Sequence, residues 1–134
     1  MAGFSSLDRH APKMLSVLRI VSGLLFLEHG TAKVLGFPAV EGVPGPALTL
    51  PGMSGPLELL FGALLVLGLF TRPVAFLAAG VCAVGYWMVH APQGTYPIVN
   101  GGETIALYCF VFLYICFAGP GPWSVDAFRG GRRR

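Results

Sequence analysis

The sequence predicts an all-α, polytopic membrane protein, an antiparallel bundle of four transmembrane helices in one domain covering residues 1–134. Three observations support this fold class. Hydrophobic residues make up 54% of the chain and charged residues only 11%, whereas an ordinary soluble domain is about 25% charged. Four apolar segments occupy most of the sequence. The charged residues that interrupt them gather toward one end of each segment.

The predicted spans are residues 14–35, 56–70, 73–89 and 104–118. A helix that crosses a hydrocarbon core of ~30 Å upright needs about 20 residues. The second and fourth spans are shorter, so they need tilt, local bilayer thinning or helical extension into their flanks. Each span is expected to be helical throughout, because lipid offers no partner for backbone polar groups. The first span lacks an Ala-x-Ala-like cleavage site and is expected to be retained.

The basic residues predict the orientation. In a four-span bundle both termini and the turn between spans two and three share one side, which carries Arg9, Lys13, Arg72, Arg129, Arg132, Arg133 and Arg134. The opposite side carries Lys33. The positive-inside rule therefore places both termini in the cytoplasm and the chain in the inner or plasma membrane. Topology and the lipid bilayer thus explain the net charge of +3, and no nucleic-acid partner is expected.

Polar residues gather at the outer end of every span. They are Glu28, His29 and Lys33 in the first span, Glu58 in the second, His90 in the third, and Asn100 and Glu103 in the fourth. Ionisable groups in a membrane are costly, about 2.5–3.5 kcal/mol each at a helix centre, so they usually face the bundle interior or pair with one another. These residues are our predicted ligand-binding layer.

The first span has a helical stripe that is expected to face inward. It consists of Arg19, Ser22, Phe26, His29 and Lys33, with Gly23 and Gly30 beside it, where small residues let a neighbouring helix approach. Arg19 either reaches the cytoplasmic headgroups or forms an internal ion pair, and we group it with Tyr108 in a predicted buried network. Glu28 lies about 180° from Arg19, so it is expected to meet a different helix.

Simpler roles remain open for several of these residues. Asn100 and Glu103 have the spacing of a capping box. Gly55 and Glu58 fit the N-cap and third positions of a helix, where acidic side chains are favourable. Lys33 and His90 could also mark the outer interface.

Metal and haem chemistry has weak support. Cys82, Cys109 and Cys116 lie within spans without a Cys-x-x-Cys motif, and are read as small apolar packing residues. Glu28, His29 and Glu103 show no recognised metal-ligand spacing. Haem ligation by His29 and His90 is an unfavoured alternative.

Several short motifs resemble the DoxX family of small four-helix membrane proteins. They are Leu18-Arg19-Ile20, Glu28-His29-Gly30 with Lys33, Glu58 followed by Gly62, Gly68-Leu69-Phe70-Thr71-Arg72, and Asn100-Gly101-Gly102-Glu103 with Tyr108. The resemblance covers about residues 13–128. It implies an association with membrane redox systems, such as archaeal quinol-oxidising or thiosulfate:quinone oxidoreductase complexes. It supplies no catalytic residues.

Two functional hypotheses follow. In the first, the chain is a subunit of a redox complex, rather than a catalyst alone, whose outer layer binds a quinone, a quinol or a similar small ligand. In the second, it is a non-catalytic membrane scaffold or accessory subunit that docks and stabilises a larger protein complex.

Overall fold

The computed structural model describes residues 4–43 and 50–131, in which every regular element is a helix. The long helices are α2 (Ala11–Leu35), α4 (Gly55–Leu67), α5 (Thr71–Gly85) and α7 (Glu103–Ala118). The short helices are α1 (Ser5–Asp8), α3 (Leu50–Met53), α6 (Pro97–Asn100) and α8 (Val125–Gly131). A π-helical turn, η1 (Tyr86–His90), and a 3₁₀ turn, η2 (Ala91–Gln93), continue α5.

The four predicted helices are confirmed, with shifted ends. α2 begins three residues early because Pro12 suits the first turn of a helix. α4 stops at Leu67, short of the predicted Phe70, because Gly68 adopts a left-handed conformation at φ 67° and ends the helix. The short helices α3 and α6 fall in the connections 36–55 and 91–100, and were not predicted. Residues 44–49 of the first connection lie outside the described chain.

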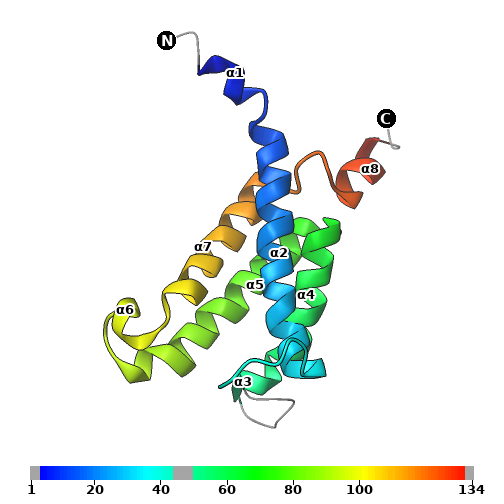
Figure 1. Ribbon diagram of the computed structural model, residues 1–134. Coiled ribbons are helices and arrows are strands. Elements are labelled where there is room, and N and C mark those ends of the chain that lie inside the picture. The colour runs from blue at the N-terminus through cyan, green and yellow to red at the C-terminus, as the bar shows by residue number, and fades with distance from the viewer. Residues whose placement is uncertain (1–3, 44–49, 132–134) are drawn as a thin grey trace.

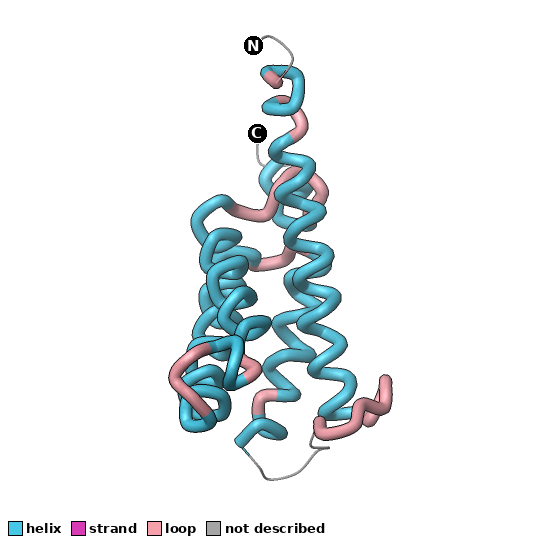
Figure 2. The backbone as a smooth tube through the Cα atoms, turned by 60° about the vertical axis from the view of Figure 1, so that its left-hand side comes forward, coloured by secondary structure: helices cyan, strands magenta, loops and turns pink. Residues whose placement is uncertain are grey.

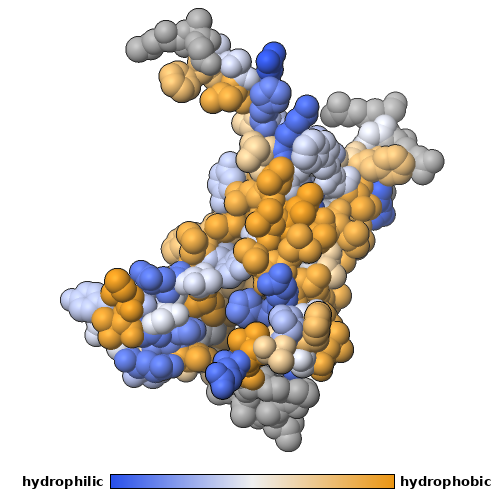
Figure 3. Space-filling model, viewed as in Figure 1, coloured by the Kyte–Doolittle hydropathy of each residue, from blue (hydrophilic) through white to orange (hydrophobic). Residues whose placement is uncertain are grey.

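Among the described helices, the continuous segment Thr71–Gln93 is the one long and apolar enough to cross a membrane alone. α4 and α7 are apolar but shorter, with 13 and 16 residues. Figure 3 shows apolar side chains over the middle of one face and hydrophilic ones toward both ends, with a hydrophilic patch over the lower half of α2.

The long helices form two antiparallel pairs (Figures 1 and 2). α2 packs along α4 and α5 along α7, while the pairs meet mainly through α4 and α5. One end of the bundle, which we name the terminal end, carries α1 and α8 with the two chain termini. The opposite end, named the loop end, carries α3 and α6. In Figure 1 the two pairs diverge toward the loop end.

Glycines bring α2 and α4 into close contact. A Cβ atom on Gly30 would lie 2.6 Å from the Cα of Leu59, and one on Gly62 would lie 2.7 Å from the Cα of Leu27. Both distances are too short for any other residue, so the backbones touch. The predicted role of the small residues beside the inward stripe of the first span is thereby confirmed at Gly30.

The core lies between the pairs. Phe26 of α2 stacks edge-on against Phe112 of α7 with ring centroids 5.0 Å apart, and Leu65, Ala75 and Ala78 are fully buried beside them. Cys82 belongs to the same apolar cluster, in agreement with its predicted packing role.

Candidate functional site

The strongest polar cluster at the loop end joins α2 to α4. Lys33 Nζ lies 2.7 Å from Glu58 Oε1 and donates a second hydrogen bond of 2.9 Å to Ser54 Oγ. The Ser54 hydroxyl in turn donates to Glu58 Oε1 over 2.8 Å. Only 12% of the Lys33 side chain and 9% of the Glu58 side chain is exposed. Two members of the predicted layer are therefore a buried ion pair.

The second carboxylate oxygen of Glu58 is different. Oε2 is buried and finds no hydrogen-bond partner among the residues that the structure describes. A buried oxygen without a donor costs about 1–3 kcal/mol, more if charged. The predicted capping role does not explain this oxygen. The N-cap of α4 is Ser54 rather than Gly55, and no backbone N–H of the first turn bonds to Oε2 of Glu58. Glu58 thus offers an unused acceptor.

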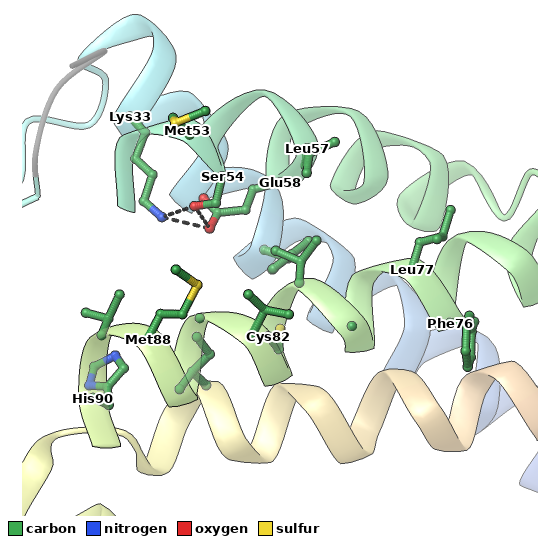
Figure 4. Close-up of a pocket in the computed structure, with 17 residues that line it drawn as sticks. Lys33, Met53, Ser54, Leu57, Glu58, Phe76, Leu77, Cys82, Met88 and His90 are labelled. Carbon is green, nitrogen blue, oxygen red and sulfur yellow. Dashed lines mark hydrogen bonds and ion pairs between the residues drawn. The ribbon is translucent and has the colours of Figure 1, made fainter. Parts of the chain in front are cut away.

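This ion pair borders a cleft of about 660 Å³ between α4 and α5 (Figure 4). The lining is otherwise largely apolar and includes Met53, Leu57, Phe76, Leu77, Val81, Val84 and Met88. Gly80 lies on the α5 wall, where a Cβ atom would meet no atom within 4 Å. The cleft has the size and apolar character of a small-molecule site with a few fixed polar groups.

His90 lines the same cleft from the end of η1. Its Nδ1 lies 3.0 Å from the carbonyl oxygen of Asn100. A carbonyl only accepts hydrogen bonds, so Nδ1 carries the proton, and Nε2 of the neutral ring is an acceptor. The amide of Asn100 is held by the Tyr86 hydroxyl at 3.2 Å and the Gly94 carbonyl at 2.9 Å. The π-helical turn and α6 together fix the imidazole at the rim.

Asn100 is buried, but it is not the N-cap of α7. It is the last residue of α6, and its side-chain oxygen accepts a 2.8 Å hydrogen bond from the backbone N–H of Gly102. α7 begins at Glu103, whose side chain is exposed. The capping-box interpretation of these two residues is therefore wrong by two residues, because the N-cap of α7 is Gly102 and Glu103 is the first residue of the helix.

Glu28 and His29 lie apart from the cleft. Both are exposed on α2. The His29 ring stands edge-on to Tyr108 of α7, with centroids 6.3 Å apart. The carboxylate of Glu28 makes no hydrogen bond or ion pair with any described residue, but its charge acts on Tyr108 of α7, which is the other helix that it approaches.

The structure separates the predicted buried network. Tyr108 packs against Phe26 and Phe112 in the middle of the bundle, whereas Arg19 is fully buried at the terminal end. Within the described residues, no three histidine, cysteine or acidic side chains cluster as metal ligands would.

Arg19 bonds to neither headgroups nor a carboxylate. Its guanidinium donates to the carbonyls of Leu65 at 2.5 Å and Val66 at 2.9 Å, at the C-terminus of α4. It also donates to the carbonyl of Pro120 at 2.8 Å and to that of Trp123. Of these acceptors, the Val66 carbonyl is one that the helix end leaves free, whereas the Leu65 carbonyl also accepts the backbone N–H of Gly68. Arg19 thereby ties α2 to α4 and to the segment after α7.

Two further charged residues act at the terminal end. Arg72 donates to the last carbonyls of α7, at Cys116 and Phe117, over 2.8 and 2.6 Å. Asp126 of α8 accepts the backbone N–H groups of Phe70 and Thr71 at 3.0 and 2.8 Å. Burial alone would raise the pKa of Asp126, but these bonds and the charge of Arg129 outweigh it and lower the pKa.

Sequence reasoning missed this terminal-end cluster of Arg72 and Asp126, and at the cleft it missed Ser54 and Gly80. Gly80 gave a usable signal, since an isolated glycine within an apolar helix usually has a packing or functional reason. Asp126 gave none, because its partners are backbone groups 55 and 56 residues away.

Comparison with known proteins places the chain among membrane proteins. The DoxX family model matches residues 14–91. An uncharacterized protein of Haemophilus influenzae is 40% identical over 129 residues, covering 91% of this chain and 95% of its own. The inner membrane protein YphA of Escherichia coli is 30% identical over 127 residues, with 86% and 89% covered.

A third relative, an uncharacterized membrane protein of Mycobacterium tuberculosis, is 28% identical over 136 residues, covering 90% of this chain and 83% of its own. No solved structure matches. The family model spans more than half of the chain, and the similarity to the first two relatives extends over most of it. Together with the all-helical bundle and its apolar surface, these matches show that the chain belongs to the DoxX family of membrane proteins.

Proposed function

We propose that this protein is a small inner-membrane subunit of a redox system, and that the cleft between α4 and α5 binds a quinol or quinone. Its four long helices cross the bilayer with both termini in the cytoplasm, and the loop end faces outward. The observation that carries the binding proposal is the buried, unpartnered Oε2 of Glu58 at the polar end of an apolar cleft.

The polar groups of the cleft select the ligand class. Glu58 Oε2 needs a donor, and Nε2 of His90 is a second acceptor once Nδ1 is bonded to Asn100. A ligand with hydroxyl groups on a flat apolar ring supplies both donors and fills the apolar walls. The two-hydroxyl form, a quinol, therefore fits better than the quinone, whose carbonyl oxygens only accept.

Each neighbouring residue has a defined part in this proposal. Lys33 and Ser54 hold Oε1 of Glu58, which fixes the carboxylate and leaves Oε2 for the ligand. Asn100 orients His90 and sets its tautomer. No electron-transfer step is assigned to these residues; a partner subunit would accept electrons from the bound quinol.

A cleft-filling variant tests the proposal. Gly80→Leu places a side chain in open space within the cleft and replaces glycine within a helix, a change that by itself favours the helix by about 0.5–1 kcal/mol. We expect wild-type thermal stability in mild detergent together with loss of binding of a short-chain ubiquinol or menaquinol analogue, measured by equilibrium dialysis.

Gly80→Ala is the matched control, because it removes the glycine but fills little of the cleft, and it should bind as wild type does. Glu58→Gln should weaken the quinol more than the quinone, since the amide can turn its NH₂ group to a ligand carbonyl. Equal binding by wild type and Gly80→Leu, or no binding by wild type, would reject the cleft as a quinol site.

The scaffold function remains the second candidate. It is favoured by the wide apolar faces that the bundle exposes, for example Leu107, Phe110 and Phe117 of α7. A scaffold predicts that Gly80→Leu leaves cellular function intact, while substitutions on an exposed face remove a co-purifying protein.

A further inference from the structure

The cleft between α4 and α5 extends well beyond its polar groups. Figure 4 shows Glu58 level with Cys82 of α5, with His90 on one side of that level and Phe76 and Leu77 on the other. At ~1.5 Å per residue, the helical segment from Cys82 to His90 covers about 12 Å, and the segment from Cys82 to Phe76 covers a further 9 Å or about that. A ring held between Glu58 and His90 therefore occupies only the first of these two stretches.

The α5 wall of the cleft is an apolar groove with an open side. Residues spaced by four positions form one row along a helix, and such a row of α5 lines the cleft: Phe76, Gly80, Val84 and Met88. All of them are also exposed, so the cleft opens along this row. The row lies within Thr71–Gln93, the described segment long and apolar enough to cross a membrane. In the proposed placement the opening therefore faces lipid. We name this row, together with Leu77, the α5 groove.

Charge at the polar end decides which kind of amphiphile fits the α5 groove. Oε2 of Glu58 needs a hydrogen-bond donor, and the positive charge of Lys33 is already paired with Oε1 of the same carboxylate. The phosphate of a phospholipid would bring acceptor oxygens and a second negative charge to this oxygen. A neutral head with hydroxyl groups supplies the donor without that repulsion. The chain in the groove therefore belongs to such a head rather than to a phospholipid.

We propose that the α5 groove holds the apolar chain of the quinol, so that the ligand is a long-chain quinol that enters sideways from the bilayer. This inference rests on the proposed function. The ring lies toward the loop end, and the chain runs past Gly80 to Phe76 and Leu77. Gly80 is the position that determines specificity for the chain, because a larger side chain there would fill the open space through which the chain passes.

A comparison of ligands with and without a chain tests the groove. Decylubiquinol and the same quinol head without a chain are bound to wild type and Gly80→Leu in lipid nanodiscs. We expect Gly80→Leu to weaken decylubiquinol about tenfold, as overpacking of a filled site does, and to leave the affinity for the chain-free quinol unchanged. Gly80→Ala should bind both ligands as wild type does. If Gly80→Leu lost both ligands at wild-type thermal stability, the chain groove would be rejected but the quinol site would stand. If wild type bound neither, the proposed function itself would fail.

Photolabelling locates the chain directly. A decylubiquinol that carries a diazirine at the end of its chain should label Phe76 and Leu77, as read by peptide mass spectrometry, and excess decylubiquinol should suppress this labelling. A phospholipid with a diazirine in its acyl chain is the comparison probe, and it should label the exposed Phe110 and Phe117 of α7 without suppression. If the quinol probe labelled Phe76 and Leu77 no more than Phe110 and Phe117, or if excess decylubiquinol had no effect, lipid would be the occupant of the groove and the inference would be overturned.

Discussion

The two ends of the bundle use charged residues in opposite ways. At the terminal end Arg19, Arg72 and Asp126 bond to backbone groups at the ends of α4, α5 and α7. At the loop end, Lys33 and Glu58 bond to each other through side chains beside a cleft, and one oxygen is left without a partner. The terminal end consists of helix-end contacts and leaves the buried hydroxyl of Thr71 without a hydrogen-bond partner among the described residues, whereas the loop end leaves a carboxylate oxygen unbonded beside a cleft.

This difference separates residues that hold the fold from residues that line the candidate site. Bonds to backbone carbonyls and N–H groups do not depend on which side chains surround them, and they connect elements far apart in the sequence. A buried ion pair adds little net stability compared with apolar residues of the same shape. Stability alone therefore does not explain a buried pair that leaves one carboxylate oxygen unbonded beside the cleft.

The largest expected effect is at Arg19. Arg19→Leu would leave the carbonyls of Val66, Pro120 and Trp123 without their donor, while that of Leu65 would keep only the backbone N–H of Gly68. We expect a loss of about 3–5 kcal/mol in unfolding free energy, since each buried orphan group costs about 1–3 kcal/mol. The unfolding free energies of wild type and Arg19→Leu can be compared by SDS titration in mixed micelles.

Arg72→Leu is the comparison for that experiment. Arg72 also donates to two carbonyls, but it is exposed, so water can replace it and the loss should be smaller. Equal losses for the two variants would mean that burial of Arg19 does not matter.

Lys33 should give the next largest effect. Lys33→Met leaves the carboxylate of Glu58 buried without its cation, which should cost about 3 kcal/mol in unfolding free energy. The double variant Lys33→Met/Glu58→Leu removes both charges and should regain most of that stability, while quinol binding stays lost. If the double variant were as unstable as the single one, the pair would be structural, and the contrast between the two ends would fail.

Asp126 should have the smallest effect. Asp126→Asn weakens the bonds to the N-terminus of α5 and should cost about 1 kcal/mol, as other losses of helix capping do. Because the folded pKa of Asp126 is lowered, its contribution is complete above the unfolded value of about 4 and is lost as pH falls through the folded pKa. Lowering the pH should therefore reduce the unfolding free energy of wild type more than that of Asp126→Asn. Parallel curves of unfolding free energy against pH for the two proteins would contradict this.

Much of the fold could be predicted from the sequence because it depends on local signals. Apolar segments and glycine or proline positions specified the four long helices, and Gly30 correctly indicated close packing. The π-helical turn could not be predicted, because it depends on Asn100 holding His90 and Tyr86 from another element.

The candidate site was predicted only in part, for a similar reason. Residue depth placed Lys33, Glu58, His90 and Asn100 near the loop end, but depth alone did not separate them from the exposed Glu28, His29 and Glu103. That separation depends on how α4 and α5 diverge. The interpretation of Arg19 failed because its acceptors are backbone carbonyls, which every residue has and which no sequence pattern identifies.

The position of His90 at the rim of the cleft depends on the number of residues in the π-helical turn Tyr86–His90. Such a turn holds one residue more than the α-helical geometry around it. Removing any one residue from it would let the helix return to ordinary winding and rotate the imidazole away from its carbonyl partner, even with every other side chain kept. The site is therefore sensitive to single-residue insertions and deletions in a segment that could tolerate many substitutions, and relatives that differ in length there would be expected to differ in ligand.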